Sequence, residues 1–433
     1  MSSTGMGNTL GTLPPGWNGL PLKRWVAVKI TDGPHETPAF VDDGIPFISA
    51  EAMQDGRINF DAKRGFVSPE SHEQYCRKLR PQRDDVFLCK SGATTGKVAI
   101  VETDAEFSVW SPLALVRTDR GKMLPKFIYF ALHADYLQDQ VKTTWTHGTQ
   151  PNISMGAIER LYVVAPDVRR QAQLVRLIDA KTAKIDSLIA KKERLIELLQ
   201  EKRAALISHA VTRGLNPKVP MKDSGVEWLQ KIPQSWTMAR NKSLFHEVDD
   251  RSVSGEGELL TVSHITGVTR RSEKPDVTMF LSETLEGYKK CNTGDVVVNT
   301  MWAFMGALGT AFLPGVVSPS YNVYRLRHHD RMDPRFLDLL YRTPLYKSQV
   351  FRYSKGIWHS RLRLYPEAFF EIVTVVPPLP EQRSIVEYVG KVAAKENREL
   401  TLLQESIDRL REYRTALISA AVTGKIDVRE EVA

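Results

Sequence analysis

Two segments of the sequence combine basic, aromatic and amide side chains within stretches typical of loops. Arg and Lys can neutralise phosphates or bind the O6 and N7 atoms of guanine, and Asn or Gln can bridge N6 and N7 of adenine. The segments, residues 142–154 (KTTWTHGTQPNIS) and 351–363 (FRYSKGIWHSRLR), indicate nucleic-acid recognition. Their candidate contacts are Lys142, Trp145, His147, Thr149, Gln150 and Asn152, and then Arg352, Lys355, Trp358, His359, Arg361 and Arg363.

Two other interpretations of these segments stay open. Trp145 and Trp358 could be buried anchors of their loops, and any single residue could belong to an ordinary solvated surface. Matching basic loops in both halves of the chain favour recognition for the pair. Further candidates are Lys90, Ser91, Thr94, Thr95 and Lys97 in the first half, and Arg270, Arg271, Asn299, Thr300 and Trp302 in the second.

The motifs that support catalysis are either defective or missing. Residues 92–98 (GATTGKV) resemble a phosphate-binding loop, but the glycines are one residue too close and Val98 replaces the hydroxyl that would bind Mg²⁺. His328 and His329 are adjacent, so their side chains point apart and form a poor metal chelate. The sequence lacks GxSxG, HExxH, glycine-rich dinucleotide fingerprints and the Asn-Pro-Pro-aromatic motif of adenine methyltransferases. We therefore expect a binding protein, with no metal site and no catalytic residues.

Composition agrees with a polyanionic partner. The 433 residues carry a net charge of +8 and a pI near 9.2. The three cysteines lie far apart, which predicts a reducing, cytoplasmic environment without disulfides. We expect no membrane span, because no apolar run approaches the roughly 20 residues that a bilayer requires.

The chain contains an internal repeat. Residues 201–212 (EKRAALISHAVT) and 412–423 (EYRTALISAAVT) are identical at nine of twelve positions, at an offset of 211 residues. The match extends over about 50 residues and places Gln171 on Gln382. Each copy begins with an apolar run that ends in proline and continues as a long helical segment closed by a glycine, Gly214 or Gly424.

The long segments have the apolar spacing of coiled coils. In the first copy we expect positions 174, 178, 185, 188, 195, 199 and 206 to form the apolar seam. A helix of about 40 residues with so thin a stripe needs a partner helix. Its own second copy is the natural partner.

The remaining parts of the two halves correspond weakly. Each contains short β-rich runs and one short amphipathic helix, at residues 126–141 and 335–350. We therefore expect an α+β fold with two globular domains, two long helices packed as a coiled coil and a pseudo-two-fold internal repeat. The predicted boundaries are 1–168 for the first domain, 169–213 for the first helix, 214–235 for a linker, 236–379 for the second domain, 380–425 for the second helix and 426–433 for a tail.

Several motifs resemble the specificity subunits of type I restriction-modification systems. They are the linker at 212–236 (TRGLNPKVPMKDSGVEWLQKIPQSW), Pro380-Glu381-Gln382-Arg383, the ending ALISAAVTGKI at 416–426 and GTQPNIS at 148–154. The resemblance covers nearly the whole chain. The sequence departs from the family pattern at residues 356–364 (GIWHSRLRL). It also departs at the start of the first helix, which lacks the Pro-Glu of the second.

The resemblance implies a non-catalytic subunit with two target-recognition domains, each reading one half of a bipartite double-stranded DNA sequence. It implies that the two helices pack antiparallel and bind two adenine methyltransferase subunits, and that two ATP-dependent motor-nuclease subunits can join. S-adenosylmethionine, ATP and Mg²⁺ are then expected in the partner subunits, with no cofactor in this chain. The alternative hypothesis is an orphan helical scaffold that binds methyltransferase chains without reading DNA sequence.

Overall fold

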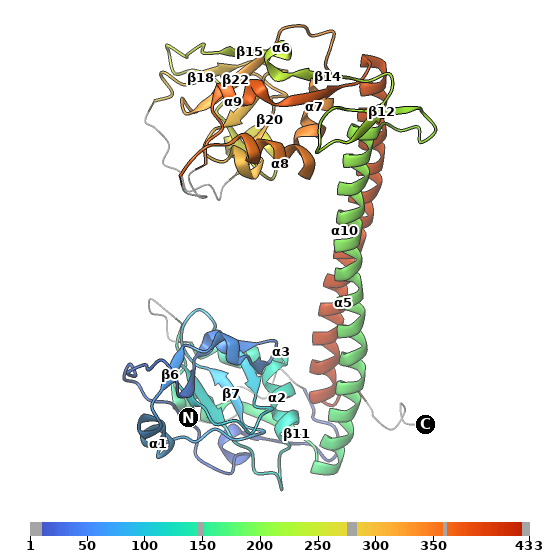
Figure 1. Cartoon of the computed structure of the whole chain (residues 1–433). Helices are drawn as coiled ribbons and strands as arrows, with labels where there is room; N and C mark the ends of the chain where they lie inside the picture. Colours follow the sequence, from blue (N-terminus) through green and yellow to red (C-terminus); the bar gives the residue numbers. More distant parts are fainter. Residues whose placement is uncertain (1–10, 146–150, 275–283, 358–361, 427–433) are drawn as a thin grey trace. The chain divides into compact units, whose positions relative to one another are not determined.

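A computed structural model describes residues 11–145, 151–274, 284–357 and 362–426. Contacts divide the chain into two units (Figure 1): unit 1 comprises residues 1–192 and 404–433, and unit 2 comprises residues 193–403. The globular part of unit 1 before its long helix is called domain 1. The globular part of unit 2 from Trp236 onward is called domain 2.

The helices are few and mostly short, except for two. They are α1 (Pro69–Cys76), α2 (Pro125–His133), α3 (Asp135–Thr143), α4 (Met155–Arg160), α5 (Val168–Arg213), α6 (Asn241–Leu244), α7 (Pro334–Tyr341), α8 (Pro344–Tyr353), α9 (Pro366–Glu371) and α10 (Leu379–Val422). The long helices α5 and α10 have 46 and 44 residues.

The strands are short and numerous. Those of unit 1 are β1 (Asn18–Pro21), β2 (Thr31–Asp32), β3 (Ile45–Ile48), β4 (Met53–Gln54), β5 (Arg57–Ile58), β6 (Gly65–Val67), β7 (Val86–Cys89), β8 (Val98–Ile100), β9 (Ser108–Val109), β10 (Leu113–Val116) and β11 (Tyr162–Ala165). Those of unit 2 are β12 (Met221–Asp223), β13 (Lys231–Pro233), β14 (Thr237–Arg240), β15 (Phe245–Val248), β16 (Leu260–Ser263), β17 (Gly267–Arg270), β18 (Lys289–Cys291), β19 (Val296–Asn299), β20 (Leu308–Thr310), β21 (Gly315–Val317), β22 (Tyr321–Leu326) and β23 (Val373–Val376).

Each domain has its own sheet, and the two sheets have equivalent strand orders. The order is β2-β10-β7-β8 in domain 1, where β5 and β4 extend the sheet, and β15-β22-β19-β20 in domain 2. A buried ion pair recurs in both sheets: Arg117 donates two hydrogen bonds of 2.7 Å to Asp85, and Arg325 donates two of 2.8 and 2.7 Å to Asp295. The globular parts of the two halves, which correspond only weakly in sequence, therefore have the same sheet and the same buried ion pair.

The prediction of one amphipathic helix before each basic loop was wrong, because each half has two helices. In domain 1, α2 ends at His133 and α3 begins after Ala134, whose backbone is extended with ψ 144°. In domain 2, Thr343 caps the second helix and Pro344 occupies its first turn. A proline has no N–H for the preceding helix, so the chain restarts there instead of continuing.

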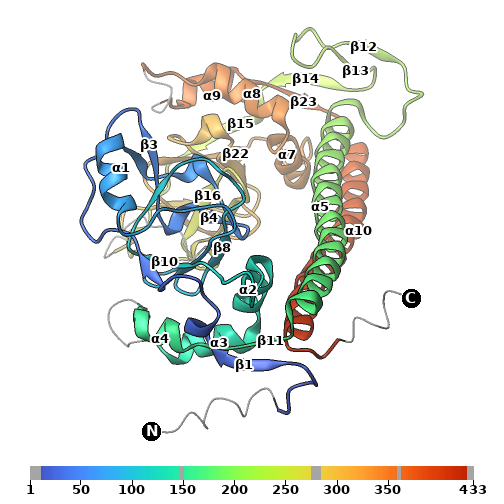
Figure 2. The ribbon, with the colours of Figure 1, turned by 90° about the horizontal axis from the view of Figure 1, so that it is seen from below.

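The long helices run antiparallel and side by side in each unit (Figure 2). In unit 1, Arg414 donates a hydrogen bond of 2.9 Å to Asp186; in unit 2, Arg203 donates one of 2.8 Å to Asn397. Arg203 and Asp186 stand 211 residues before Arg414 and Asn397, so the two pairs are equivalent contacts of the repeat. The predicted α+β fold with a repeated, antiparallel helix pair is confirmed.

The predicted seam of the first helix was wrong at two positions. Leu188 and Leu195 are each 44% exposed, whereas Ile185 is buried and Ile196 and Leu199 are half-buried. The buried side follows alternate steps of three and four residues from Thr182, so positions 188 and 195 fall beside it. A polar residue, Thr182, therefore occupies a core position that apolar spacing alone does not reveal.

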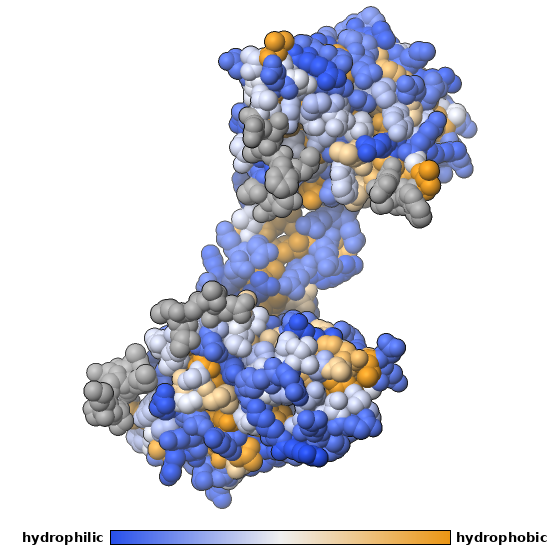
Figure 3. All heavy atoms as spheres, turned by 90° about the vertical axis from the view of Figure 1, so that its left-hand side faces the viewer, coloured by the Kyte–Doolittle hydropathy of each residue, from blue (hydrophilic) through white to orange (hydrophobic). Residues whose placement is uncertain are grey.

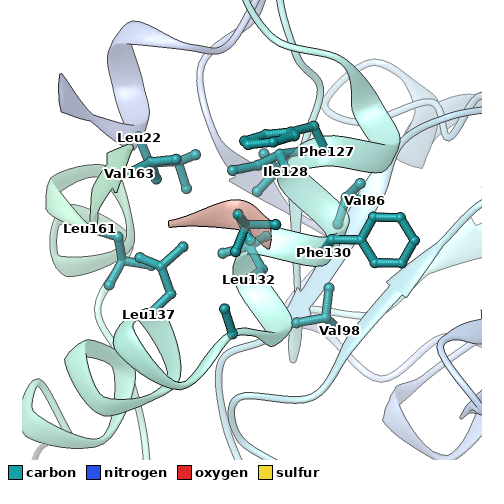
Figure 4. Packing of buried hydrophobic residues seen from close by; sticks show 14 of the residues in the cluster. Leu22, Val86, Val98, Phe127, Ile128, Phe130, Leu132, Leu137, Leu161 and Val163 are labelled. Atoms are coloured by element: carbon teal, nitrogen blue, oxygen red, sulfur yellow. The ribbon is translucent and has the colours of Figure 1, made fainter. Parts of the chain in front are cut away.

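Each domain core includes parts of both long helices. The core of domain 1, whose centre is shown in Figure 4, contains Leu174 and Ile178 from α5 together with Ala421 and Val422 from α10. The core of domain 2 contains the equivalent residues, Ile385 and Val389 from α10 with Ala210 and Val211 from α5. Each domain is thus built on the start of the helix that follows it and on the end of the other helix.

A buried glutamine fixes the start of each long helix to its domain. The Gln171 side chain accepts a hydrogen bond from the Leu124 N–H and donates to the Lys122 and Pro166 carbonyls, each at 2.8 Å. Gln382 repeats this arrangement with the backbone of Asp333, Arg331 and Pro377 at 2.8, 2.9 and 2.8 Å. Neither glutamine is exposed to solvent.

Each long helix ends against a tryptophan, but the two tryptophans differ in hydrogen bonding. Gly214 lies against Trp236, and Gly424 lies against Trp17. The Trp236 indole donates to Glu381 at 2.8 Å, whereas the buried Trp17 indole N–H has no hydrogen-bond partner among the described residues. In the first half, Arg170 stands where the second half has Glu381.

We expect the substitution Arg170→Glu to stabilise unit 1 by about 1 kcal/mol, because the carboxylate would accept from the Trp17 indole and suits the first turn of a helix. Hydrogen exchange of β1 and of the α10 end would measure the change. Arg170 makes a contact of its own, so Arg170→Ala is the control for its loss. Faster exchange in Arg170→Glu than in Arg170→Ala would contradict this prediction.

Candidate nucleic-acid interface

In domain 1 the structure joins two of the segments predicted to bind nucleic acid. The loop after β7 (residues 90–97) and the segment before α4 (residues 151–154) are linked by backbone hydrogen bonds. The Ile153 N–H donates to the Lys90 carbonyl at 2.7 Å, and the Gly92 N–H donates to the Pro151 carbonyl at 3.1 Å. The side chain of Gln138 holds the same loop to α3, because it donates to the Gly96 carbonyl at 3.0 Å.

Domain 2 has the same junction. The loop after β19 meets the segment that precedes α9, where the Leu364 N–H donates to the Thr300 carbonyl at 3.3 Å. Lys355 and Arg363 form an isolated β-bridge through two backbone hydrogen bonds of 2.9 Å. Candidate residues that are far apart in sequence therefore converge at the same end of the sheet in each domain.

The side chains of Lys90, Asn299 and Thr300 bind partners inside their own domains. Lys90 is only 12% exposed and forms an ion pair with Asp32 at 3.2 Å. Burial alone would raise the pKa of Asp32, but the ammonium groups of Lys78 and Lys90 outweigh it and hold that pKa below its usual value. Asn299 is buried and donates to the Tyr321 hydroxyl at 3.2 Å, and Thr300 donates to the Ser320 carbonyl at 3.0 Å.

Two hydroxyl-bearing residues of the same loop, Ser91 and Thr95, are half-buried. Ser91 is half-buried and its backbone forms a β-bridge with Asn152. Thr95 donates to the Gly92 carbonyl at 2.7 Å and lies 3.1 Å from the Pro151 carbonyl. Its hydroxyl thus closes the loop.

Other candidates reach solvent. Exposed polar and cationic side chains at the two junctions are those of Thr94, Lys97, Lys142, Asn152, Arg352, Lys355 and Arg363. Arg352 lies 3.9 Å from Glu227, a weak contact between two exposed groups. Arg270 lies 3.8 Å from both Glu258 and Glu273, and Arg271 donates to the Lys274 carbonyl at 3.1 Å.

The aromatic candidates behave differently in the two domains. Trp145 is half-buried and packs against the core of domain 1, as expected for a loop anchor. Trp302 is 51% exposed on the loop of domain 2. Apolar residues, orange in Figure 3, form a few patches on a surface that is otherwise mostly hydrophilic. The candidates His147, Thr149, Gln150, Trp358, His359 and Arg361 lie outside the described residues.

Sequence reasoning missed the residues that surround these loops. Gln138, which holds the first loop, sits inside a helical segment without any motif of its own. In domain 2, Lys274, Arg342 and Lys347 lie near one another, and Arg342 lowers the pKa of both lysines in addition to the larger effect of burial. Their separation in sequence hides this cluster.

Chemical groups of other kinds are scarce here. Within the described ranges, no group of three or more His, Cys, Asp or Glu side chains is arranged to hold a metal ion. Across the same residues, no helix has the length and apolar character needed to cross a membrane. The described part of the interface offers hydrogen bonds, positive charge and the exposed indole of Trp302.

Comparison with known proteins gives partial sequence matches. No family model matches the sequence. The chain is 22% identical over 223 residues to the type I restriction enzyme StySPI specificity subunit of Salmonella potsdam, covering 50% of this chain and 47% of that protein. It is 22% identical over 213 residues to the EcoKI specificity subunit of Escherichia coli K12, covering 48% and 45%. The chain thus spans about half the length of the curated relatives it matches.

Solved structures match over nearly the whole chain. The HsdS subunit from Thermoanaerobacter tengcongensis aligns with a TM-score of 0.53 and 15% identity, covering 96% of this chain and 98% of that one. A chain from a study of complex assembly and conformational transition of the type I R-M system aligns with a TM-score of 0.63 and 16% identity, covering 96% and 100%. The chain has the fold of an HsdS subunit. The resemblance inferred from sequence motifs is therefore confirmed by sequence similarity and by fold.

Proposed function

We propose that this chain is a non-catalytic DNA sequence-specificity subunit of a type I restriction-modification complex. One observation supports it above the others. Equivalent loop junctions lie on equivalent sheets in the two domains, yet the two junctions carry different exposed side chains. A common scaffold with unlike contact residues suits two readers of two unlike half-sites.

Within this proposal, the exposed side chains at the junctions contact DNA. In domain 1 we assign contacts to Thr94, Lys97, Lys142 and Asn152, together with His147, Thr149 and Gln150. In domain 2 we assign contacts to Trp302, Arg352, Lys355, Arg363, Arg270 and Arg271, together with Trp358, His359 and Arg361. Lys90, Asn299 and Thr300 support the loops, since their side chains have partners inside the domain.

The remaining parts of the proposal concern partners. The helix pair would dock two adenine methyltransferase subunits, one near each equivalent surface of the repeat, and motor-nuclease subunits would join this assembly. S-adenosylmethionine, ATP and Mg²⁺ would act in those subunits. The predicted domain boundaries, with domain 1 at 1–168 and domain 2 at 236–379, and a cytoplasmic location belong to the same proposal, the latter supported by three unpaired cysteines.

A base-resolution map of adenine methylation in the source cell, with and without this gene, tests the function. Loss of one bipartite motif on deletion is the expected result, and it would also give the target sequence. An unchanged map in cells that express the whole complex would favour the scaffold without sequence reading. That scaffold would show a steep dependence of DNA binding on salt but no preference among sequences.

Exchange of residues 1–165 for another recognition domain should change one half of the methylated motif completely and leave the other half intact. The reason is that each domain has its own sheet, core and loop junction. Methylation mapping after the exchange measures both halves at once. A change in both halves, or in neither, would contradict separate reading.

A further inference from the structure

The loops after β7 and β19 correspond residue by residue. The Cys89 N–H donates to the Lys97 carbonyl at 2.8 Å, and the Asn299 N–H donates to the Ala307 carbonyl at 3.0 Å, so eight residues separate the closing pair in both. Gly96 and Gly306 occupy the same place with φ of +94° and +96°. The two loops therefore have the same length and the same closing glycine, while the backbone differs at Gly92, with φ of +94°, and at Trp302, with φ of −122°.

The side chains of the second loop are large and apolar. Gly92, Thr94 and Thr95 of domain 1 are replaced in domain 2 by Trp302, Phe304 and Met305. Trp302 and Met305 remain 51% and 41% exposed. The Trp302 ring is nearly parallel to that of Phe304, with centroids 6.4 Å apart and an interplanar angle of 14°.

The loop presents this indole on a firm backbone. The Trp302 N–H donates to the Asn299 carbonyl at 3.0 Å, and the Trp302 carbonyl accepts from the Ala307 N–H at 3.1 Å. Between them lies the 3-10 turn η6 (Ala303–Met305). A side chain of this size held exposed by a closed turn is preorganised for contact with a partner.

Cationic side chains lie beside the loop that carries the indole, and they favour an anionic partner. The methylene chain of Lys347 packs so closely on Gly306 that a Cβ there would approach its Cε to 2.5 Å. Arg342 lies near Lys347, donates to the Leu308 carbonyl at 3.2 Å and lies 3.4 Å from Asp338. Burial lowers the pKa of Lys347, and the nearby guanidinium of Arg342 lowers it further. Lys355 and Arg363, which pair in a β-bridge before α9, add two exposed cationic side chains.

We propose that Trp302 is a wedge that inserts against the base stack of the half-site read by domain 2, while the cations beside it hold the phosphates. This inference rests on the DNA-reading function proposed above. Apolar side chains inserted at a base step unstack and kink the duplex, and flexible pyrimidine–purine steps yield most easily. Domain 2 then selects its half-site partly by deformability. Domain 1, with Gly92 and Thr94 in the corresponding loop, reads its own half-site by polar contacts.

The test uses the chain assembled with its methyltransferase subunits and duplexes that carry the mapped target. One 2-aminopurine replaces a base at successive steps of the domain 2 half-site, because its fluorescence rises when it is unstacked. The wild-type complex should raise the fluorescence at one step. Trp302→Ala should abolish that rise and weaken binding about tenfold to hundredfold, and Trp302→Phe should retain most of both.

Two variants serve as matched controls. Phe312→Ala removes another half-exposed aromatic ring, 49% exposed, from the same domain and should change neither signal. Thr94→Ala alters the equivalent loop of domain 1. It should leave the fluorescence in the domain 2 half-site unchanged and should weaken only the preference for the domain 1 half-site. Thermal unfolding of each variant shows whether it folds as the wild type does.

The proposal is overturned if no step of the half-site brightens with the wild-type complex, or if Trp302→Ala binds the target within twofold of the wild type. It is also overturned if Trp302→Ala loses methyltransferase subunits instead of DNA affinity, since the indole would then be a protein contact. Failure of the underlying function looks different: the wild-type complex itself would not prefer the target to a scrambled duplex.

Discussion

Replacing Gln382 by alanine is expected to loosen domain 2 from the start of α10 by about 3 kcal/mol or more. The substitution leaves the Asp333 N–H and the Arg331 and Pro377 carbonyls without their partner. Each buried group without a hydrogen bond costs about 1–3 kcal/mol. Gln171→Ala should produce the same loss in domain 1.

Hydrogen exchange of the full chain resolves the two effects, because one global unfolding curve does not describe a chain of two units. Gln382→Ala should accelerate exchange roughly hundredfold in β23 and α7, and leave domain 1 unchanged. Gln404→Ala is the matched control, since Gln404 is an exposed glutamine on the same helix. Equal exchange in Gln382→Ala and Gln404→Ala would disprove an anchoring role.

Removing the buried carboxylate of Asp295 from the sheet of domain 2 should have an effect of similar size. Asp295→Ala leaves Arg325 uncompensated beside the core and takes the acceptor from the Asn292 N–H, which lies 2.7 Å away. We expect about 3 kcal/mol, the lower end for a broken buried pair, because Arg325 is 30% exposed and can still reach water. Asp85→Ala should do the same to domain 1.

Exchange rates of β19, β20 and β22 report Asp295→Ala, and those of β7, β8 and β10 report Asp85→Ala. Asp295→Asn keeps an oxygen for the Asn292 N–H while removing the charge, so its effect should be intermediate. An asparagine variant as unstable as the alanine variant would show that charge, and not the backbone hydrogen bond, dominates at this position.

The sequence revealed the repeat because helical packing restricts which residue types fit at fixed spacing. The sequence repeat places Gln171 on Gln382, and Gly214 and Gly424 mark the ends of the two helices. The exact seam of α5 was harder, since Thr182 is buried and Leu188 is half-exposed, against their usual preferences. The break between α2 and α3 at Ala134 has no glycine or proline to mark it, whereas Pro344 marks the break between α7 and α8 in the sequence.

The site was predictable in composition but not in geometry. Basic and aromatic residues mark the loop segments in the sequence, and the fold brings those segments together within each domain. Whether a lysine reaches solvent or neutralises a carboxylate depends on contacts over long sequence separations, such as Lys90 with Asp32. The cluster of Lys274, Arg342 and Lys347 arises in the same way, from segments that only the fold brings together.

The shared cores also determine the order in which the chain can fold during synthesis. Unit 2 is one continuous segment, residues 193–403, whereas domain 1 needs Ala421 and Val422 from the end of α10 to complete its core. Domain 1 leaves the ribosome first, yet it must wait for almost the entire chain before that apolar surface is covered. Domain 2 can finish earlier although it is made later. A ribosome that stops before residue 404 would therefore release a chain whose older domain, and not the newer one, is incomplete.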